Sequence, residues 1–368
     1  MNLLEKQIER YKKEIHSDSY PMSIGEAVSM YINGELDIHP EFQRIYRWTL
    51  EQKSKFIESI LLGIPIPSFF VAQRLDGVWD LVDGLQRFST ILSFLGELRD
   101  ENGSLLPPLT LSKGGYLDAL AGATWADGKT MTQSLKLSFR REKIDFKIIK
   151  KESTVDTKYE LFRRINTGGS MLSDQEVRNC LLLMANKEFY EWMAKLSRDK
   201  NFVATTPISE DKYSEQYNLE LVTRFIVFNS LDWKKINSST ISDLGEFLND
   251  NIVLLAEDKN YKMKNTENIF KETFKILNET LGNDVFKKYY ASNKGHSGGF
   301  SIALFEAVSI GIARNIAQLR KNYDLNKLRS KIQNFSLQNV FVSKSGSGVR
   351  ASTRISKTIP AAIQYFST

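Results

Sequence analysis

The sequence predicts an α+β protein, with a mixed N-terminal region followed by an all-α C-terminal region. Strand and helix patterns alternate up to about residue 155, and residues 156–368 show helical periodicity without a convincing strand. A chain of 368 residues can hold two or three domains with separate cores. We therefore predict an N-terminal helix over 1–20, a mixed domain over 21–155 and a helical domain over 156–368 with a basic end.

Local signals predict the elements of the mixed region. Ser23 is placed to cap a helix over 24–32, and residues 36–38 follow as a short extended segment. Thr49 and Gln52 have the spacing of a capping box, which opens a helix that Gly63 ends. The remaining predicted elements are strands over 68–73 and 78–82 joined by an Asp76-Gly77 turn, a helix over 86–95, and a strand over 143–149.

The helical region is predicted from apolar positions repeating at helical spacing. The expected helices cover residues 159–165, 173–184, 189–196, 219–228, 242–255, 267–281, 300–317 and 325–332. The segment 295–299, Gly-His-Ser-Gly-Gly, precedes one of these helices. It is either an ordinary loop with a cap or a cradle for a phosphate.

Composition narrows the class of protein. A single cysteine excludes a disulfide framework, and no segment reaches the ~20 apolar residues that a membrane span needs, so we expect a cytoplasmic protein without a membrane partner. The net charge is +6, and the last 68 residues hold 10 Lys and Arg against 2 Asp and Glu. This basic end either faces a polyanion or is a solvated surface. Within its hydroxyl-rich segment 343–354, Arg350 and Arg354 are the candidate nucleic-acid contacts, unless the segment is an ordered loop.

The motif Asp83-Gly84-Leu85-Gln86-Arg87 lies between a predicted strand and a predicted helix. A glycine there lets the backbone turn tightly and approach a ligand, and the first amides of the helix then point at an anion. Arg87 has the forked geometry that suits phosphate, Asp83 could orient a nucleophile or hold a metal-bound water, and Gln86 could position that water. The same pattern also occurs as an ordinary turn.

Two further segments carry candidate residues. Phe42–Trp48 places Gln43 and Arg44 among aromatic side chains just before a capped helix. Residues 162–179 read as a helix, an Asn-Thr-Gly-Gly turn and a second helix with a capping box. This local account assigns no structural role to three polar side chains, those of Asn166, Arg178 and Asn179.

Together these motifs resemble the GmrSD-type restriction protein family over about residues 20–185. Its members carry an F-Q-R-x-Y-x-W segment, an E-S-I-L-L-G-I-P-I-P helix end, a D-G-Q-Q-R motif and an I-N-T-G-G-x-x-L-S-x-Q-E-x-R-N segment. The second of these is present in full at 58–67. The resemblance implies a ParB/sulfiredoxin-like fold for the mixed domain, in which the D-G-Q-Q-R segment supports nucleotide binding and hydrolysis.

By position, the resemblance implies two sets of site residues. Asp83, Gln86 and Arg87 would be catalytic. The residues implied to bind nucleotide are Gln43, Arg44, Gly84, Asn166, Thr167, Gly168, Gly169, Arg178 and Asn179. One departure is Leu85, which stands where the family has its first glutamine. Either hydrolysis is weakened or lost, or this side chain faces the core.

The expected function is a nucleotide-binding, NTP-hydrolysing component of a prokaryotic anti-phage restriction system that acts on foreign DNA. GTP or ATP is the expected cofactor, and Mg²⁺ is the candidate ion accompanying it. The three histidines are too scattered for an H-N-H nuclease centre, so DNA cleavage would need a separate nuclease subunit. Two alternatives stay open: a non-catalytic module that senses nucleotide or DNA, and a ParB-like domain that is itself a nuclease. The sequence also leaves open whether the chain forms a homo-oligomer.

Overall fold

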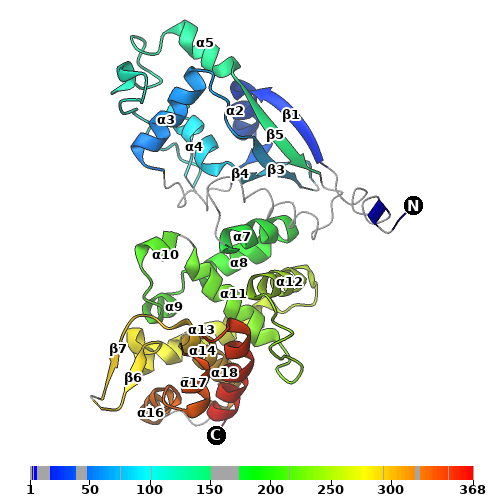
Figure 1. Ribbon diagram of the computed structural model, residues 1–368, viewed down its shortest axis with the longest axis vertical. Coiled ribbons are helices and arrows are strands. Elements are labelled where there is room, and N and C mark those ends of the chain that lie inside the picture. The colour runs from blue at the N-terminus through cyan, green and yellow to red at the C-terminus, as the bar shows by residue number, and fades with distance from the viewer. Residues whose placement is uncertain are drawn as a thin grey trace. The chain divides into compact units, whose positions relative to one another are not determined.

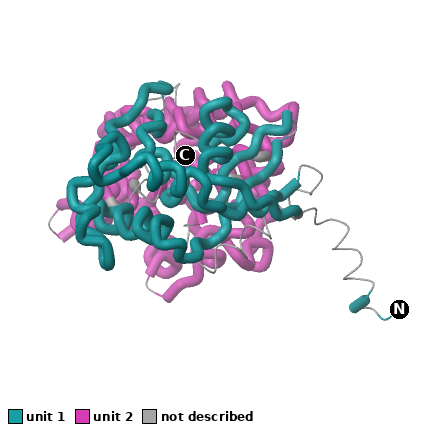
Figure 2. Tube along the Cα trace, turned by 90° about the horizontal axis from the view of Figure 1, so that it is seen from above, with its two compact units in different colours: residues 1–171 teal, residues 172–368 magenta. Residues whose placement is uncertain are grey.

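The structure is a computed structural model in which two compact units, residues 1–171 and 172–368, divide the chain (Figure 2). The first unit contains a five-stranded mixed sheet and the second is mainly helical, which confirms the α+β prediction. The predicted domain boundaries stay predictions. The structure describes residues 2, 4–5, 17–38, 48–74, 76–100, 102–150, 174–214, 216–292, 294–319, 324–346 and 348–367.

The sheet of the first unit has the strand order β1-β5-β3-β4-β2. Strand β1 is antiparallel to β5, β5 is parallel to β3, β3 is antiparallel to β4, and β4 is parallel to the short β2. The β3–β4 hairpin is the one predicted, and Gly77 takes a positive φ of 92° in its turn. The strands are β1 (Ser17–Ser23), β2 (Leu36–Asp37), β3 (Phe69–Gln73), β4 (Trp79–Asp83) and β5 (Lys143–Ile149).

Helices of the first unit gather on one side of this sheet (Figure 1). Alternate residues of the strands, including Phe69, Val71 and Phe146, join apolar helix residues in one hydrophobic core. The capping box at Thr49 and Gln52 is present as predicted, and Ser23 caps the first helix through the backbone amide of Glu26. The helices are α2 (Ile24–Ile32), α3 (Leu50–Leu61), α4 (Leu85–Leu95) and α5 (Gln133–Arg141), with a 3₁₀ turn at Asp118–Leu120.

The second unit is built from helices around a core rich in phenylalanine, in which Phe202, Phe225, Phe270 and Phe274 contact one another. Its elements are α7 (Asp174–Ala185), α8 (Lys187–Leu196), α9 (Lys200–Thr205), α10 (Glu210–Ser214), α11 (Tyr217–Ser230), α12 (Leu244–Glu257), α13 (Met263–Thr280), a 3₁₀ turn at Gly282–Asp284, β6 (Lys288–Tyr290), β7 (Gly295–Ser297), α14 (Ile302–Arg314), α15 (Ile316–Leu319), α16 (Leu325–Phe335), α17 (Asn339–Lys344) and α18 (Ala351–Phe366).

Three local predictions need correction. Residues 17–20 belong to strand β1, not to an N-terminal helical segment, because they pair with β5 along the edge of the sheet. The helical region contains the β6–β7 hairpin, whose second strand covers the predicted loop at 295. Helix α18 extends from Ala351 to Phe366, so the end of the hydroxyl-rich segment 343–354, with Arg354, is helical and not a loop. In the part of the chain that the structure describes, no helix is both long and apolar enough to cross a membrane.

Candidate functional site

The Asp83–Arg87 motif forms the turn between β4 and α4. The β3–β4 ladder shifts register between Phe70 and Val71, so that Asp83 pairs with Phe70 while Leu81 pairs with Val71. Such bulges redirect a side chain and are frequent beside active sites. Gly84 follows with a φ of 101° and is the N-cap of α4, so the cap has no side chain to accept a hydrogen bond from the first helix amides. The turn thus presents the positive end of a helix dipole beside a carboxylate.

Glycine is required at position 84 for two separate reasons. The positive φ favours glycine, and a Cβ at this position would lie 2.5 Å from Cδ1 of Phe69. Phe69 is fully buried and stacks on Phe146, with ring centroids 5.3 Å apart. The backbone at Gly84 therefore lies close to the aromatic core of the first unit. A residue with a Cβ at this position would have to displace the ring of Phe69.

Arg87 acts as a clamp within the site. Its Nη1 donates to the carbonyl oxygen of Pro67, both terminal nitrogens lie 3.3 Å from the carbonyl oxygen of Ser68, and its Nη2 donates to Asp83 at 3.0 Å. The guanidinium also lies 4.8 Å from the ring centroid of Phe69. Burial lowers the pKa of Arg87 while Asp83 opposes this, and an arginine stays charged in either case. In this conformation Arg87 holds Asp83 and the segment before β3 in place, rather than pointing at an open phosphate position.

Gln86 connects this turn to the aromatic-arginine motif. Its Oε1 accepts a hydrogen bond of 3.1 Å from the backbone amide of Trp48, the last residue of that motif. Leu85 packs against the hydrophobic core, which agrees with the interpretation that it faces inward. Gln43 and Arg44 lie outside the described residues, as do Asn166, Thr167, Gly168 and Gly169. The structure therefore brings Asp83, Gly84, Gln86 and Arg87 together and leaves the other proposed contacts of this pocket as predictions.

Arg178 and Asn179 have a structural role that the sequence did not reveal. Both are buried, at 1% and 0% exposure. Arg178 donates to Asn249 of α12 at 2.7 Å and to Gln175, and Asn179 donates to Gln216 beside α11. Side chains that are fully enclosed and hydrogen-bonded within the protein are not available to a ligand. The interpretation of Arg178 and Asn179 as nucleotide contacts is therefore revised: they join α7 to its neighbouring helices.

Arg354 also binds within the second unit. Its Nε donates to Glu306 at 3.0 Å, and Glu306, which is fully buried in α14, accepts from Arg224 of α11 at 2.6 Å as well. Burial lowers the pKa of Arg224, but Glu306 and Glu220 outweigh it and the net pKa is raised. Arg354 was a candidate nucleic-acid contact in the sequence; in the structure its side chain binds Glu306 instead. Arg350 is exposed at the N-cap of α18 and stays a candidate.

A second anchored carboxylate was missed by sequence reasoning. Glu58 of α3 is 4% exposed and accepts hydrogen bonds from the amides of Gly115, Tyr116 and Leu117 at 2.9, 2.7 and 2.6 Å. A Cβ on Gly114 would lie 2.2 Å from the Glu58 carboxylate. The available signal was the Gly114-Gly115 pair, because adjacent glycines let successive amides converge on one anion.

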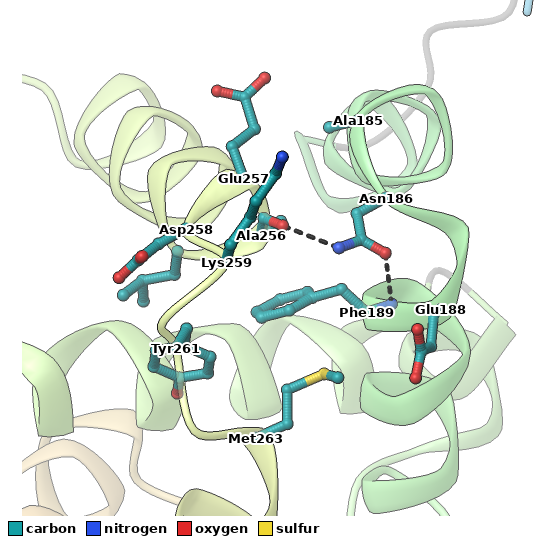
Figure 3. A pocket seen from close by; sticks show the side chains of 11 residues that line it. Ala185, Asn186, Glu188, Phe189, Ala256, Glu257, Asp258, Lys259, Tyr261 and Met263 are labelled. Carbon is teal, nitrogen blue, oxygen red and sulfur yellow. Dashed lines mark hydrogen bonds between the residues drawn. The ribbon is translucent and has the colours of Figure 1, made fainter. Parts of the chain in front are cut away.

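A hollow of about 460 Å³ lies in the second unit, between the start of α8 and the connection from α12 to α13 (Figure 3). Asn186 spans it by donating to the carbonyl oxygen of Ala256 at 2.8 Å and accepting from the amide of Phe189 at 3.0 Å. None of the predicted site residues that the structure describes lines it. Its charged lining residues are Glu188, Glu257, Asp258 and Lys259, an acidic balance that disfavours phosphate. Among the described residues, no group of three or more His, Cys, Asp or Glu could hold a metal ion.

Comparison with known proteins finds a similarity in the N-terminal part of the chain. Residues 24–183 match the family described as GmrSD restriction endonuclease, N-terminal domain. The match contains the Asp83–Arg87 turn and also most of α7, which belongs to the second compact unit. No curated protein and no solved structure matches the chain. Residues 24–183 are therefore similar to the N-terminal domain of GmrSD restriction endonucleases, and this similarity points to a component of a restriction system.

Proposed function

We propose that this chain binds and hydrolyses a nucleoside triphosphate as the nucleotide-dependent component of a prokaryotic restriction system. In this proposal the protein acts on foreign DNA together with a separate nuclease subunit. The observation that carries it is the β4–α4 turn, where a helix begins at a left-handed glycine without a capping side chain. Its first amides are the kind of donors that bind phosphate groups, and the helix dipole favours negative charge.

The proposed roles follow from the contacts of each side chain. Asp83 is 27% exposed and has one oxygen on Arg87, so its other oxygen can face a water molecule or a Mg²⁺ ion accompanying the nucleotide. Arg87 is the positioning residue that fixes Asp83 and the Gly84 turn. Gln86 would hold the Trp48 end of the motif that carries Gln43 and Arg44.

The fit of a triphosphate to the turn is supported by its backbone. Position 84 has no room for a Cβ on the side of Phe69, and a glycine keeps the first helix amides free of side-chain cover. The bound nucleotide would supply the anhydride bond to be cleaved. The chain would contribute phosphate binding through the amides of α4, orientation of water by Asp83, and rigidity through Arg87.

The experiment is a phosphate-release assay with GTP and with ATP, in the presence of Mg²⁺, with and without DNA. Asp83→Asn should lower turnover at least about 100-fold, because it removes a group that would orient the attacking water. Asp118→Asn is the matched control, since Asp118 is exposed and pairs only with Lys113 on the surface described here. Wild-type turnover in Asp83→Asn, with the protein folded, would contradict the assignment.

A second candidate function is a non-catalytic module that senses nucleotide or DNA. Leu85 favours it, because the family glutamine is replaced by a side chain that packs against the core. Nucleotide binding without steady phosphate release would support this candidate. In that case Leu85→Gln is the informative variant, since gain of turnover would identify the missing glutamine as the cause.

A further inference from the structure

Strands β6 and β7 form a separate two-stranded sheet in the otherwise helical second unit. Figure 1 shows this ribbon projecting from the body of helices. An isolated hairpin is only marginally stable in water, so a ribbon that projects from a helical domain adds little to its stability.

The surface of the ribbon is basic and aromatic. Residues 285–305 contain three lysines and no Asp or Glu. Lys287 is engaged by Asp284 at 2.8 Å, whereas Lys288 and Lys294 are exposed. Lys288 and Tyr290 share one face, with the Lys288 Nζ 5.5 Å from the Tyr290 ring centroid, and Tyr290 is 40% exposed. A lysine beside an exposed tyrosine suits a polyanion, because both side chains can hydrogen-bond to phosphate oxygens of a nucleic-acid backbone.

The base of the ribbon is firmly held. Phe286, which is 1% exposed, packs against Phe300 and Phe305 with ring centroids 5.8 and 5.2 Å away. The backbone amide of Ser301 also donates to the carbonyl oxygen of Phe286 at 2.8 Å. A ribbon anchored in an aromatic core has its backbone held in place, so little backbone entropy is lost when it meets a partner.

We propose that the β6–β7 ribbon enters the major groove of duplex DNA, with Lys288 and Lys294 contacting phosphates. Neighbouring strands lie about 4.8 Å apart, and the major groove of B-form DNA, about 12 Å wide, admits a two-stranded ribbon. This inference rests on the proposed action of the protein on DNA and adds the surface that makes contact. The A-form groove of duplex RNA is too narrow and deep for the same ribbon.

The test compares fluorescence anisotropy of a labelled 30-base-pair DNA duplex with that of the same sequence as duplex RNA, over a series of salt concentrations. Lys288→Gln/Lys294→Gln should weaken DNA binding roughly 30-fold near 0.15 M salt and reduce the slope of log K against log salt by about 2, because two phosphate contacts are lost. Wild-type protein should prefer the DNA duplex to the RNA duplex.

The matched control is Lys234→Gln/Lys235→Gln, which removes the same two charges from the exposed loop between α11 and α12 and should leave DNA binding unchanged. Equal effects of the two double variants, unchanged binding in the ribbon variant, equal wild-type affinity for RNA, or absence of wild-type DNA binding would each overturn the inference. Nucleotide binding is measured on the same samples. If it persists while the ribbon has no effect, the inference fails and the proposed nucleotide function does not.

Discussion

At the scale of single residues, the candidate site depends on Gly84, a position where no other residue type fits without strain. Gly84 combines a positive φ with direct contact between its backbone and the buried ring of Phe69. The sequence indicated the glycine and its neighbours Asp83, Gln86 and Arg87. It could not indicate that Arg87 would bind the carbonyls of Pro67 and Ser68, because those residues precede it by about twenty positions and meet it only in the folded sheet.

Gly84→Ala should lower the free energy of unfolding of the first unit by about 2 kcal/mol or more and abolish nucleotide binding. Left-handed backbone costs a non-glycine residue about 1–2 kcal/mol, and the clash with Phe69 adds to it. Gly77→Ala is the control, because Gly77 also has a positive φ but open space around its Cβ position. Urea denaturation should therefore show a smaller loss, about 1 kcal/mol, for Gly77→Ala. Equal losses would disprove the clash.

At the scale of elements, capping and turn signals predicted most boundaries in the first unit, because they act between residues close in sequence. The anchoring of α3 is a different case. Ser54 and Glu58 of this helix hold the loop at 112–117, through the amide of Ser112 at 2.9 Å and through the three amides on Glu58. The helix residues and the loop residues that they bind lie more than fifty positions apart in the sequence. Local sequence patterns therefore do not predict this contact.

Glu58 should make stability depend on pH in the acid range. Burial by itself raises the pKa of Glu58, but the amides of Tyr116, Leu117 and Gly115, helped by Lys55, outweigh it and the net pKa is lowered. Its stabilising contribution is therefore complete above the unfolded pKa of about 4.3 and is lost as pH falls through the lower folded pKa.

Glu58→Gln should cost about 2 kcal/mol at pH 7, and urea midpoints measured from pH 7 to pH 3 should fall less steeply than in the wild type. Glu35→Gln removes a carboxylate outside this loop and serves as the control. A Glu58→Gln protein with the wild-type pH profile would show that the carboxylate contributes nothing through its charge.

At the scale of the whole molecule, buried polar contacts hold the C-terminal helix against the other helices of the second unit. The C-terminal helix α18 reaches the interior through Arg354, which shares Glu306 with Arg224. The sequence showed only a basic end, and its hydroxyl-rich composition favoured a loop. The tertiary structure uses one of those basic residues to neutralise a carboxylate that α14 carries into the core.

Glu306→Gln should destabilise the second unit by about 3 kcal/mol, because it leaves Arg354 without a buried partner charge and weakens the pairing of Arg224. Amide hydrogen exchange should accelerate in α18 before it does in α11. The control is Glu191→Gln, since Glu191 is 60% exposed in a surface pair and its loss should change stability by less than about 0.5 kcal/mol. Unchanged protection of α18 would contradict the role of Glu306.

The sequence by itself determined the α+β class, the similarity of residues 24–183 to the GmrSD N-terminal domain, most helices, and the turn from Asp83 to Arg87. These follow from short-range rules of periodicity, capping and turn chemistry. Only the tertiary structure decided that Arg87 binds Asp83 and two backbone carbonyls, that Arg178 and Asn179 are buried, that Arg354 pairs with Glu306, and that residues 288–290 and 295–297 form a two-stranded ribbon. Burial and pairing depend on which distant segments of the chain meet in the fold. The sequence alone does not show whether the partner of a charged residue is a ligand, a solvent molecule or another part of the chain.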